Sequence, residues 1–96
     1  MGSNHGTLVV GATKSDINTT GAAVLSASTN RVFVEIQNQS DVTIRVAIGE
    51  VATTTNGFRV PPGDVFFEAE RAPSAFSVCS ESGSSKVIYM TPASEV

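Results

Sequence analysis

The stretch that decides the fold is R-V-F-V-E-I-Q-N-Q-S-D-V-T-I-R-V-A-I-G, residues 31–49. It contains two alternating segments, Arg31–Gln37 and Thr43–Gly49, separated by a short polar loop. Apolar and polar residues alternating with a period of two are typical of strands that bury one face. We therefore predict that these two segments form an antiparallel hairpin.

The alternation also predicts the register of this hairpin. Pairing residues whose numbers sum to 80 places Val34 opposite Val46 on one face and Glu35 opposite Arg45 on the other, with Val32 on the buried side. A slip by one residue would exchange the two faces of the strand and set apolar against polar side chains. We expect Val34 and Val46 to be buried and the Glu35–Arg45 pair to lie toward solvent.

Composition supports strands throughout the chain. The 96 residues include 13 Val, 5 Ile and 10 Thr but only 2 Leu, and β-branched side chains favour strands over helices. Only 16% of the residues are charged, whereas 12 Ser and 10 Thr supply hydroxyl groups. A chain of this length forms one domain with a modest core. We predict a single all-β domain.

Further strands are expected wherever short apolar segments stand between turn signals such as Asn56-Gly57 and Pro61-Pro62-Gly63. These segments are Ala22–Ser26, Phe58–Val60, Val65–Glu70, Ala75–Ser80 and Lys86–Thr91. The last two are predicted to form a second hairpin through a Gly83-Ser84 turn, with Val78 opposite Tyr89 and Cys79 opposite Ile88. The fold class is therefore a small antiparallel β-sandwich or barrel of seven to eight short strands.

The N-terminal segment differs from the rest. Residues 1–20 are rich in Gly, Ser, Thr and Asn, and their apolar cluster is Leu8, Val9 and Val10. We expect residues 1–20 to be an N-terminal arm whose apolar cluster grips a neighbouring molecule, and residues 21–96 to form the sandwich. An ordinary first strand of the core is the alternative.

Charge and motif content exclude several functions. The net charge of −3 and the scattered Lys and Arg residues predict no nucleic-acid binding, and the sequence has no apolar run long enough for a membrane span. The first residues show no secretory signal pattern. Single Cys and His residues leave no multi-cysteine metal site and no Cys-His arrangement.

Candidate reactive residues are few. His5 lies in the polar N-terminal end, and Cys79 lies in an apolar strand where core packing is the simpler role. Glu68 and Glu70 are expected to share one strand face, a spacing that could serve a glycosidase or hold a cation but that is also typical of a solvated strand. We therefore expect no enzyme, no cofactor and no metal site.

Several residues expected at the surface are suited to contacts with other proteins. Phe33 is expected on the same face as Glu35, and the adjacent Phe66 and Phe67 must point to opposite faces. Aromatic residues on both faces of the sheets require either a closed two-sheet core or an oligomer. The candidate interface residues are Leu8, Val9, Val10, Phe33, Phe58 and Arg59.

The segment R-V-F-V-E-I-Q-N-Q-S-D-V-T-I-R-V-A-I-G, followed by G-F-R-V-P-P-G at residues 57–63, resembles small structural proteins of tailed bacteriophages. The resemblance rests on an I-x-N-x-S strand end, an I-x-V-A-x-G strand and a G-x-x-x-P-P-G turn, and it covers about a third of the chain. Members of that group include capsid decoration or cement proteins. It carries no catalytic or ligand signature.

The resemblance implies a non-enzymatic virion role as a capsid decoration or cement protein, made in the host cytoplasm and located on the capsid surface. The implied partners are the major capsid protein, or another virion protein, and further copies of this chain in a homo-oligomer, with a trimer favoured. A receptor- or glycan-binding knob of a fibre, or a tail or connector component, is the alternative; the absence of Trp and the single Tyr weaken the glycan reading.

Overall fold

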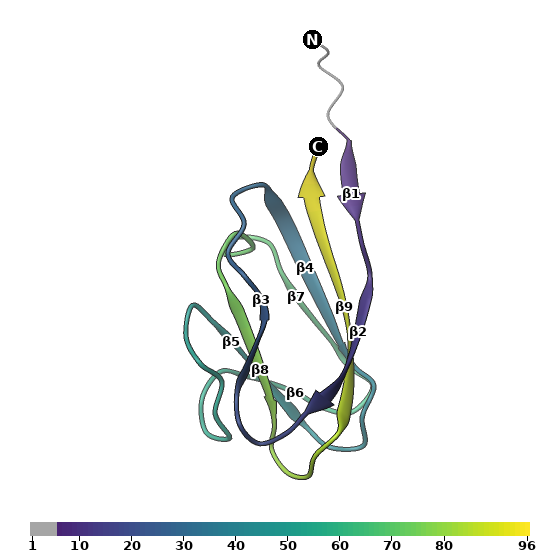
Figure 1. Cartoon of the computed structure of the whole chain (residues 1–96), viewed down its shortest axis with the longest axis vertical. Helices are drawn as coiled ribbons and strands as arrows, with labels where there is room; N and C mark the ends of the chain where they lie inside the picture. Colours follow the sequence, from purple (N-terminus) through teal and green to yellow (C-terminus); the bar gives the residue numbers. More distant parts are fainter. Residues whose placement is uncertain (1–5) are drawn as a thin grey trace.

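Two antiparallel β-sheets packed face to face make up the protein in the computed structural model, which describes residues 6–96 (Figure 1). Sheet A contains β1 (Thr7–Val9), β2 (Ala12–Ile17), β4 (Arg31–Asn38), β7 (Val65–Glu68) and β9 (Lys86–Glu95). Sheet B contains β3 (Ala22–Leu25), β5 (Ile44–Ile48), β6 (Phe58–Val60) and β8 (Phe76–Ser80). The predicted all-β sandwich is confirmed, with nine strands in the described residues where seven or eight were expected.

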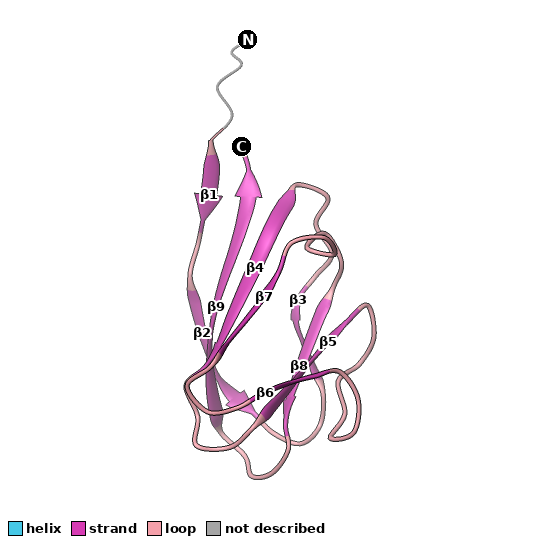
Figure 2. Ribbon diagram, turned by 180° about the vertical axis from the view of Figure 1, so that it is seen from behind, coloured by secondary structure: helices cyan, strands magenta, loops and turns pink. Residues whose placement is uncertain are grey.

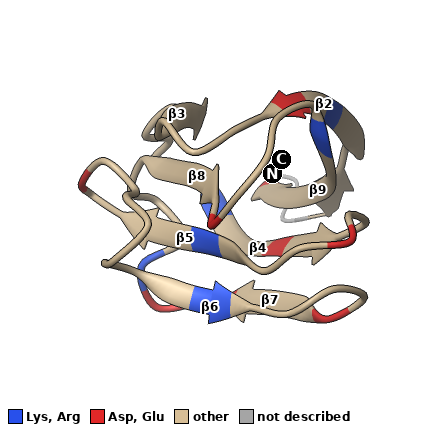
Figure 3. Ribbon diagram, turned by 90° about the horizontal axis from the view of Figure 1, so that it is seen from below, with Lys and Arg blue, Asp and Glu red and all other residues tan. Residues whose placement is uncertain are grey.

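The strand order explains how the layers meet. In sheet A, β9 pairs with β4 on one side and with both β1 and β2 on the other, while β7 closes the far edge (Figure 2). Sheet B runs in the order β3-β8-β5-β6. Viewed along the strands, β4 faces β5 and β9 faces β8 across the core (Figure 3). Consecutive strands therefore cross from one sheet to the other at most connections.

The predicted hairpin of residues 31–49 is wrong for this reason. β4 lies in sheet A between β7 and β9, and β5 lies in sheet B between β6 and β8. Glu35 is opposite Phe67 and Thr91 instead of Arg45. The predicted buried face is nevertheless right, because Val34 and Val46 are both fully buried. These two residues belong to opposing sheets whose inner faces form one core.

The predicted second hairpin is wrong in the same way. Val78 is opposite Ala22 and Val46 in sheet B, whereas Tyr89 belongs to β9 in sheet A. The connection between β8 and β9 contains Gly83 at a φ of 78°, a left-handed conformation that glycine adopts without steric cost. Gly83 thus has the conformation expected of a turn glycine, but the connection runs from sheet B to sheet A instead of joining two neighbours in one sheet.

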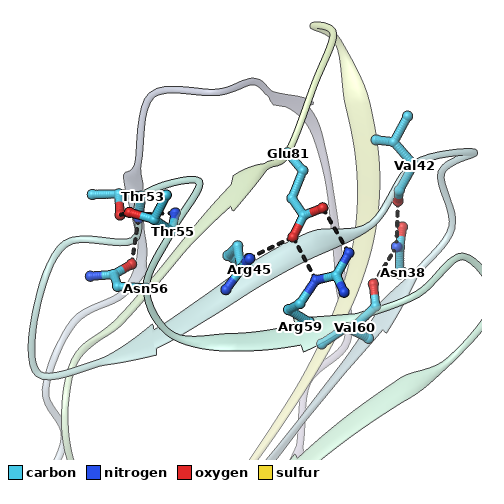
Figure 4. Close-up of polar contacts among 9 residues, drawn as sticks. All are labelled: Asn38, Val42, Arg45, Thr53, Thr55, Asn56, Arg59, Val60 and Glu81. Carbon is cyan, nitrogen blue, oxygen red and sulfur yellow. Dashed lines mark hydrogen bonds and ion pairs between the residues drawn. The ribbon is translucent and has the colours of Figure 1, made fainter.

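The crossing from β4 to β5 is held by the buried amide of Asn38. Its Nδ2 donates to the carbonyl oxygens of Val42 at 2.7 Å and Val60 at 2.8 Å (Figure 4), and its Oδ1 accepts from the backbone N–H and hydroxyl of Ser40. The backbone of Asn38 also binds the turn after β6, since its N–H donates to Asp64 O and its carbonyl accepts from Gly63 N. One side chain thus ties the corner after β4 to the end of β6.

Arg31 ties together loops at the opposite end of β4. Its guanidinium, 7% exposed as a residue, donates to the carbonyl oxygens of Ser26, Ala72 and Ser74 at 2.6–3.0 Å. Burial lowers the pKa of this guanidinium. Arg31 points inward because the β4–β9 register shifts between Arg31 and Phe33, and the same shift leaves Val32 39% exposed where burial was predicted.

The N-terminal strands β1 and β2 run alongside β9. Lys14 pairs with Ile88, and Ile17 lies in the core at 1% exposure. The sequence A-T-K-S-D-I of β2 lacks an apolar run, which is why this strand was not predicted. Leu8 and Val9, which were expected to contact a neighbouring molecule, lie in β1, a strand that pairs with β9 of the same chain.

We expect Asn38→Ala to lower the free energy of unfolding by about 2–4 kcal/mol, because the carbonyls of Val42 and Val60 lose their donor inside the protein. Chemical denaturation followed by circular dichroism measures this change. Gln39→Ala, one residue further on at an exposed site, is the matched control and should shift stability by less than about 0.5 kcal/mol. Equal effects of the two substitutions would contradict the role given to Asn38.

Candidate interaction surface

The outer face of sheet A is left uncovered by the described chain and carries several exposed apolar side chains. Side chains alternating with the buried ones point outward from each strand. Across β7, β4, β9 and β2 they form one row of Val65, Gln37, Tyr89 and Thr13, and across β7, β4 and β9 a second row of Phe67, Glu35 and Thr91. Exposed fractions reach 52% for Val65 and 55% for Phe67. We call this surface the sheet A face.

An aromatic pair lies toward its β7 edge. The rings of Phe33 and Phe67 lie 5.5 Å apart between centroids, tilted by 31°. Phe67 is directly opposite Glu35, so the two rings meet diagonally across β4 and β7. Phe33 therefore lies on the surface expected for it, and the opposite orientations of Phe66 and Phe67 are as predicted.

Phe58, a candidate interface residue, also packs within its own chain. It closes the open side of the sandwich between the edge strands β6 and β7, where its ring lies 5.2 Å from that of Phe66. The guanidinium of Arg71 lies 5.5 Å from the Phe58 ring and binds Glu68. Phe58 remains 44% exposed, so it is both a cover for the core and part of the β6 edge.

Arg59 belongs to a cluster of three charges on sheet B, the Arg45–Glu81–Arg59 cluster. Arg45 and Arg59 are directly opposite each other on β5 and β6. Glu81 accepts from Arg45 Nε at 2.6 Å and from Arg59 Nε and Nη2 at 2.7 and 3.0 Å (Figure 4). Mainly through the Arg59 bond, the two guanidinium groups lower the pKa of Glu81 to about 2. Two cations and one anion leave one positive charge.

Part of the outer face of sheet B is covered by its own chain. The loop between β5 and β6 folds back so that Ala52 packs on Ala47 and Cys79, and the Ala52 N–H donates to Ser77 Oγ at 2.9 Å. A shallow hollow of about 250 Å³ remains beside this loop, lined by Gly21, Ala23, Gly49, Glu50, Val51, Ala75, Phe76 and Ser77. Its single carboxylate, Glu50, gives it no reactive pair.

Leu8, Val9 and Val10 remain exposed although Leu8 and Val9 lie in a paired strand. Their exposed fractions are 54%, 48% and 57%. Val9 is opposite Ala93 and lies beyond Phe33 along the sheet A face, because Ala93 is also opposite Phe33. The structure thus brings Val9 and Phe33 onto one surface, whereas Arg59 lies on the other sheet.

The reactive residues singled out in the sequence are not brought together. Cys79 is fully buried, and its burial raises the pKa of the thiol. Glu68 ends β7 by accepting the Arg71 N–H at 2.8 Å, so Glu70 lies in the following turn and the predicted shared face is wrong. His5 lies outside the described residues.

Within residues 6–96 no group of three or more His, Cys, Asp or Glu side chains is placed to hold a metal ion. In the same range no helix is long and apolar enough to cross a membrane.

No protein-family model matches the chain, and no curated protein sequence matches it significantly.

The low pKa of Glu81 has a consequence for stability. A carboxyl whose pKa is lower in the folded than in the unfolded chain stabilises the fold above its unfolded pKa, and this contribution is lost as the pH falls through the folded value. We expect Glu81→Gln to be less stable than the parent chain above about pH 5. The difference should shrink toward zero near a pH of about 2. Denaturation curves at several pH values measure it, and a difference independent of pH would contradict the assignment.

The two adjacent phenylalanines offer a matched comparison. Phe66→Ala should lower the free energy of unfolding by about 2–4 kcal/mol, because Phe66 packs on the core. Phe67→Ala should cost about 1 kcal/mol or less, because Phe67 is mostly exposed and loses only its contact with Phe33. Denaturation at low protein concentration, where self-association is negligible, compares them. A larger cost for Phe67 would show that its ring is structural.

Proposed function

We propose that this chain is a non-enzymatic structural protein of a virus particle, a decoration or cement protein that binds the major capsid protein surface as a homo-oligomer. The resemblance of residues 31–63 to phage structural proteins supports the virion role. The observation that carries the binding role is the sheet A face, where Phe33, Phe67, Val65 and Tyr89 stand on an uncovered sheet surface.

The physical case for binding is the cost of leaving that surface in water. Full burial of a fully exposed large apolar side chain contributes about 1.5–3 kcal/mol, and the side chains of this face, at most about half exposed, gain a corresponding part of it. Outer sheet faces that meet only solvent are usually polar, and contiguous apolar patches on small proteins commonly mark interaction sites. The contrast within this molecule supports the same conclusion, since the loop carrying Ala52 covers the apolar side chains of Ala47 and Cys79 on the outer face of sheet B.

Quantitative mass spectrometry of purified particles from the virus that encodes this chain tests the proposal. A decoration protein should be present in a number comparable to that of the major capsid protein. A dozen copies or fewer per particle would assign the chain to a tail or fibre instead. Absence from the particle would overturn the virion role altogether.

A substitution in the sheet A face tests whether incorporation into the particle depends on this surface. Phe67→Ser should fold, because Phe67 is exposed, yet it should be depleted from the particle relative to the parent chain. Val51→Ser is the matched control, because Val51 is 64% exposed on the loop that covers sheet B. Equal incorporation of both variants would contradict a role of the sheet A face in particle binding.

A further inference from the structure

The sheet A face carries one charge near its centre, and that charge limits what can cover it. Glu35 lies between Phe67 and Thr91, and it makes no ion pair with any residue in the range 6–96. A partner that buries the aromatic pair also removes Glu35 from water. A buried carboxylate without a cation is strongly unfavourable, so the partner surface must bring a positive charge.

A symmetric contact between two sheet A faces fails this condition. In such a dimer the same patch meets itself, and both copies would bring Glu35 with no cation nearby. The remaining outward side chains of the two central rows are Val65, Gln37, Tyr89, Thr13, Phe67 and Thr91, and none of them is cationic. A second copy can therefore cover this face only with a different part of its surface.

Most cations of the chain are already engaged. Lys14 lies 3.1 Å from Asp16, Arg71 lies 3.2 Å from Glu68 and Lys86 lies 2.7 Å from Asp41. Each of these pairs is neutral. The guanidinium of Arg31 is buried against carbonyl oxygens and cannot reach another molecule.

The Arg45–Glu81–Arg59 cluster is the one surplus of positive charge on the surface of the described chain. Its outermost member is Arg59, whose side chain is 60% exposed, whereas that of Arg45 is 17% exposed. Arg59 lies on β6, the edge strand of sheet B, directly after the half-exposed Phe58. Consecutive side chains of a strand point to opposite faces, so the ring of Phe58 turns toward Phe66 and the core, while Arg59 turns toward the outer face of sheet B. A surface that meets this edge end-on contacts an aromatic ring on one side of the strand and a cation on the other, the complement of Glu35 with Phe33 and Phe67.

We propose that a second copy of this chain covers the sheet A face with its β6 edge, so that Arg59 meets Glu35 and Phe58 meets the Phe33–Phe67 pair. The contact is head to tail, because each copy uses one surface to receive and another to dock. Head-to-tail contacts close into rings when the rotation between copies allows, which is the geometry that a trimer requires. The inference rests on the homo-oligomer of the proposed function and identifies its two surfaces.

Charge exchange in the full chain tests this pairing. Analytical ultracentrifugation over a wide range of concentrations gives the dissociation constant of the oligomer. Glu35→Arg and Arg59→Glu should each weaken association by at least about tenfold, since each places like charges in contact. The double variant E35R/R59E restores an opposite pair and should return to within about threefold of the parent chain. Glu50→Arg, at an exposed position beside the hollow near β3 on the far side of sheet B from β6, is the control for a change of net charge.

Arg59→Glu also faces Glu81, so neutral variants provide a second route. Glu35→Gln and Arg59→Gln should show strongly non-additive effects on the dissociation constant if the two side chains contact each other. Thermal unfolding identifies any variant that is misfolded.

Two results would overturn the inference. Association in which the charge exchange fails to restore affinity and the neutral variants act additively would show that Glu35 and Arg59 do not meet. A parent chain that stays monomeric at all concentrations would exclude the head-to-tail contact and, with it, the homo-oligomer of the proposed function. The second result leaves the particle-binding proposal standing, because incorporation into virions is measured separately.

Discussion

The buried amide of Asn38 is the interaction on which the arrangement of the two sheets depends. It satisfies carbonyls at the corner after β4 and at the end of β6, and its backbone binds the turn that leads to β7. These segments belong to different sheets and would otherwise leave buried polar groups without partners, which costs about 1–3 kcal/mol for each group. Asn38 therefore makes a crossing between the sheets favourable where a hairpin would have been the simpler connection.

Arg31 performs a comparable role at the other end of β4 with a charged group. Its guanidinium donates to carbonyls from the loops that precede β4 and β8, with no carboxylate nearby among residues 6–96. A guanidinium suits this site because it carries several donors in a fixed plane. Both ends of β4 are thus closed by polar side chains, while Val34 and Ile36 between them fill the core.

An alternation with a period of two shows which side chains of a strand are buried, and this decides how much of the fold could be predicted from the sequence. Alternation identified the buried faces of β4 and β5, and Val34, Ile36, Ile44 and Val46 are all fully buried. It could not identify the neighbour of each strand, because a residue buried in a hairpin and one buried across a sandwich show the same pattern. Both predicted hairpins failed on this point.

The candidate surface was only partly predictable for a related reason. The outward position of Phe33 beside Glu35 followed from alternation. Its contact with Phe67 depends on the long-range pairing of β4 with β7, which no local signal reveals. β2 was missed because its one core residue, Ile17, stands at the end of a polar segment. The Arg45–Glu81–Arg59 cluster likewise joins three strands or strand ends that are distant in sequence.

We propose that the sheet A face is the surface through which this protein binds other proteins, whereas the chain itself covers part of the outer face of sheet B. Hydroxyl-radical footprinting of the free chain and of the assembled state tests it most directly, because Phe33, Phe67 and Tyr89 report on the face individually. The account predicts that these three side chains are reactive in the dilute chain and protected in the assembly, with the buried Phe76 unreactive in both. Unchanged reactivity of Phe33, Phe67 and Tyr89 upon assembly would contradict it.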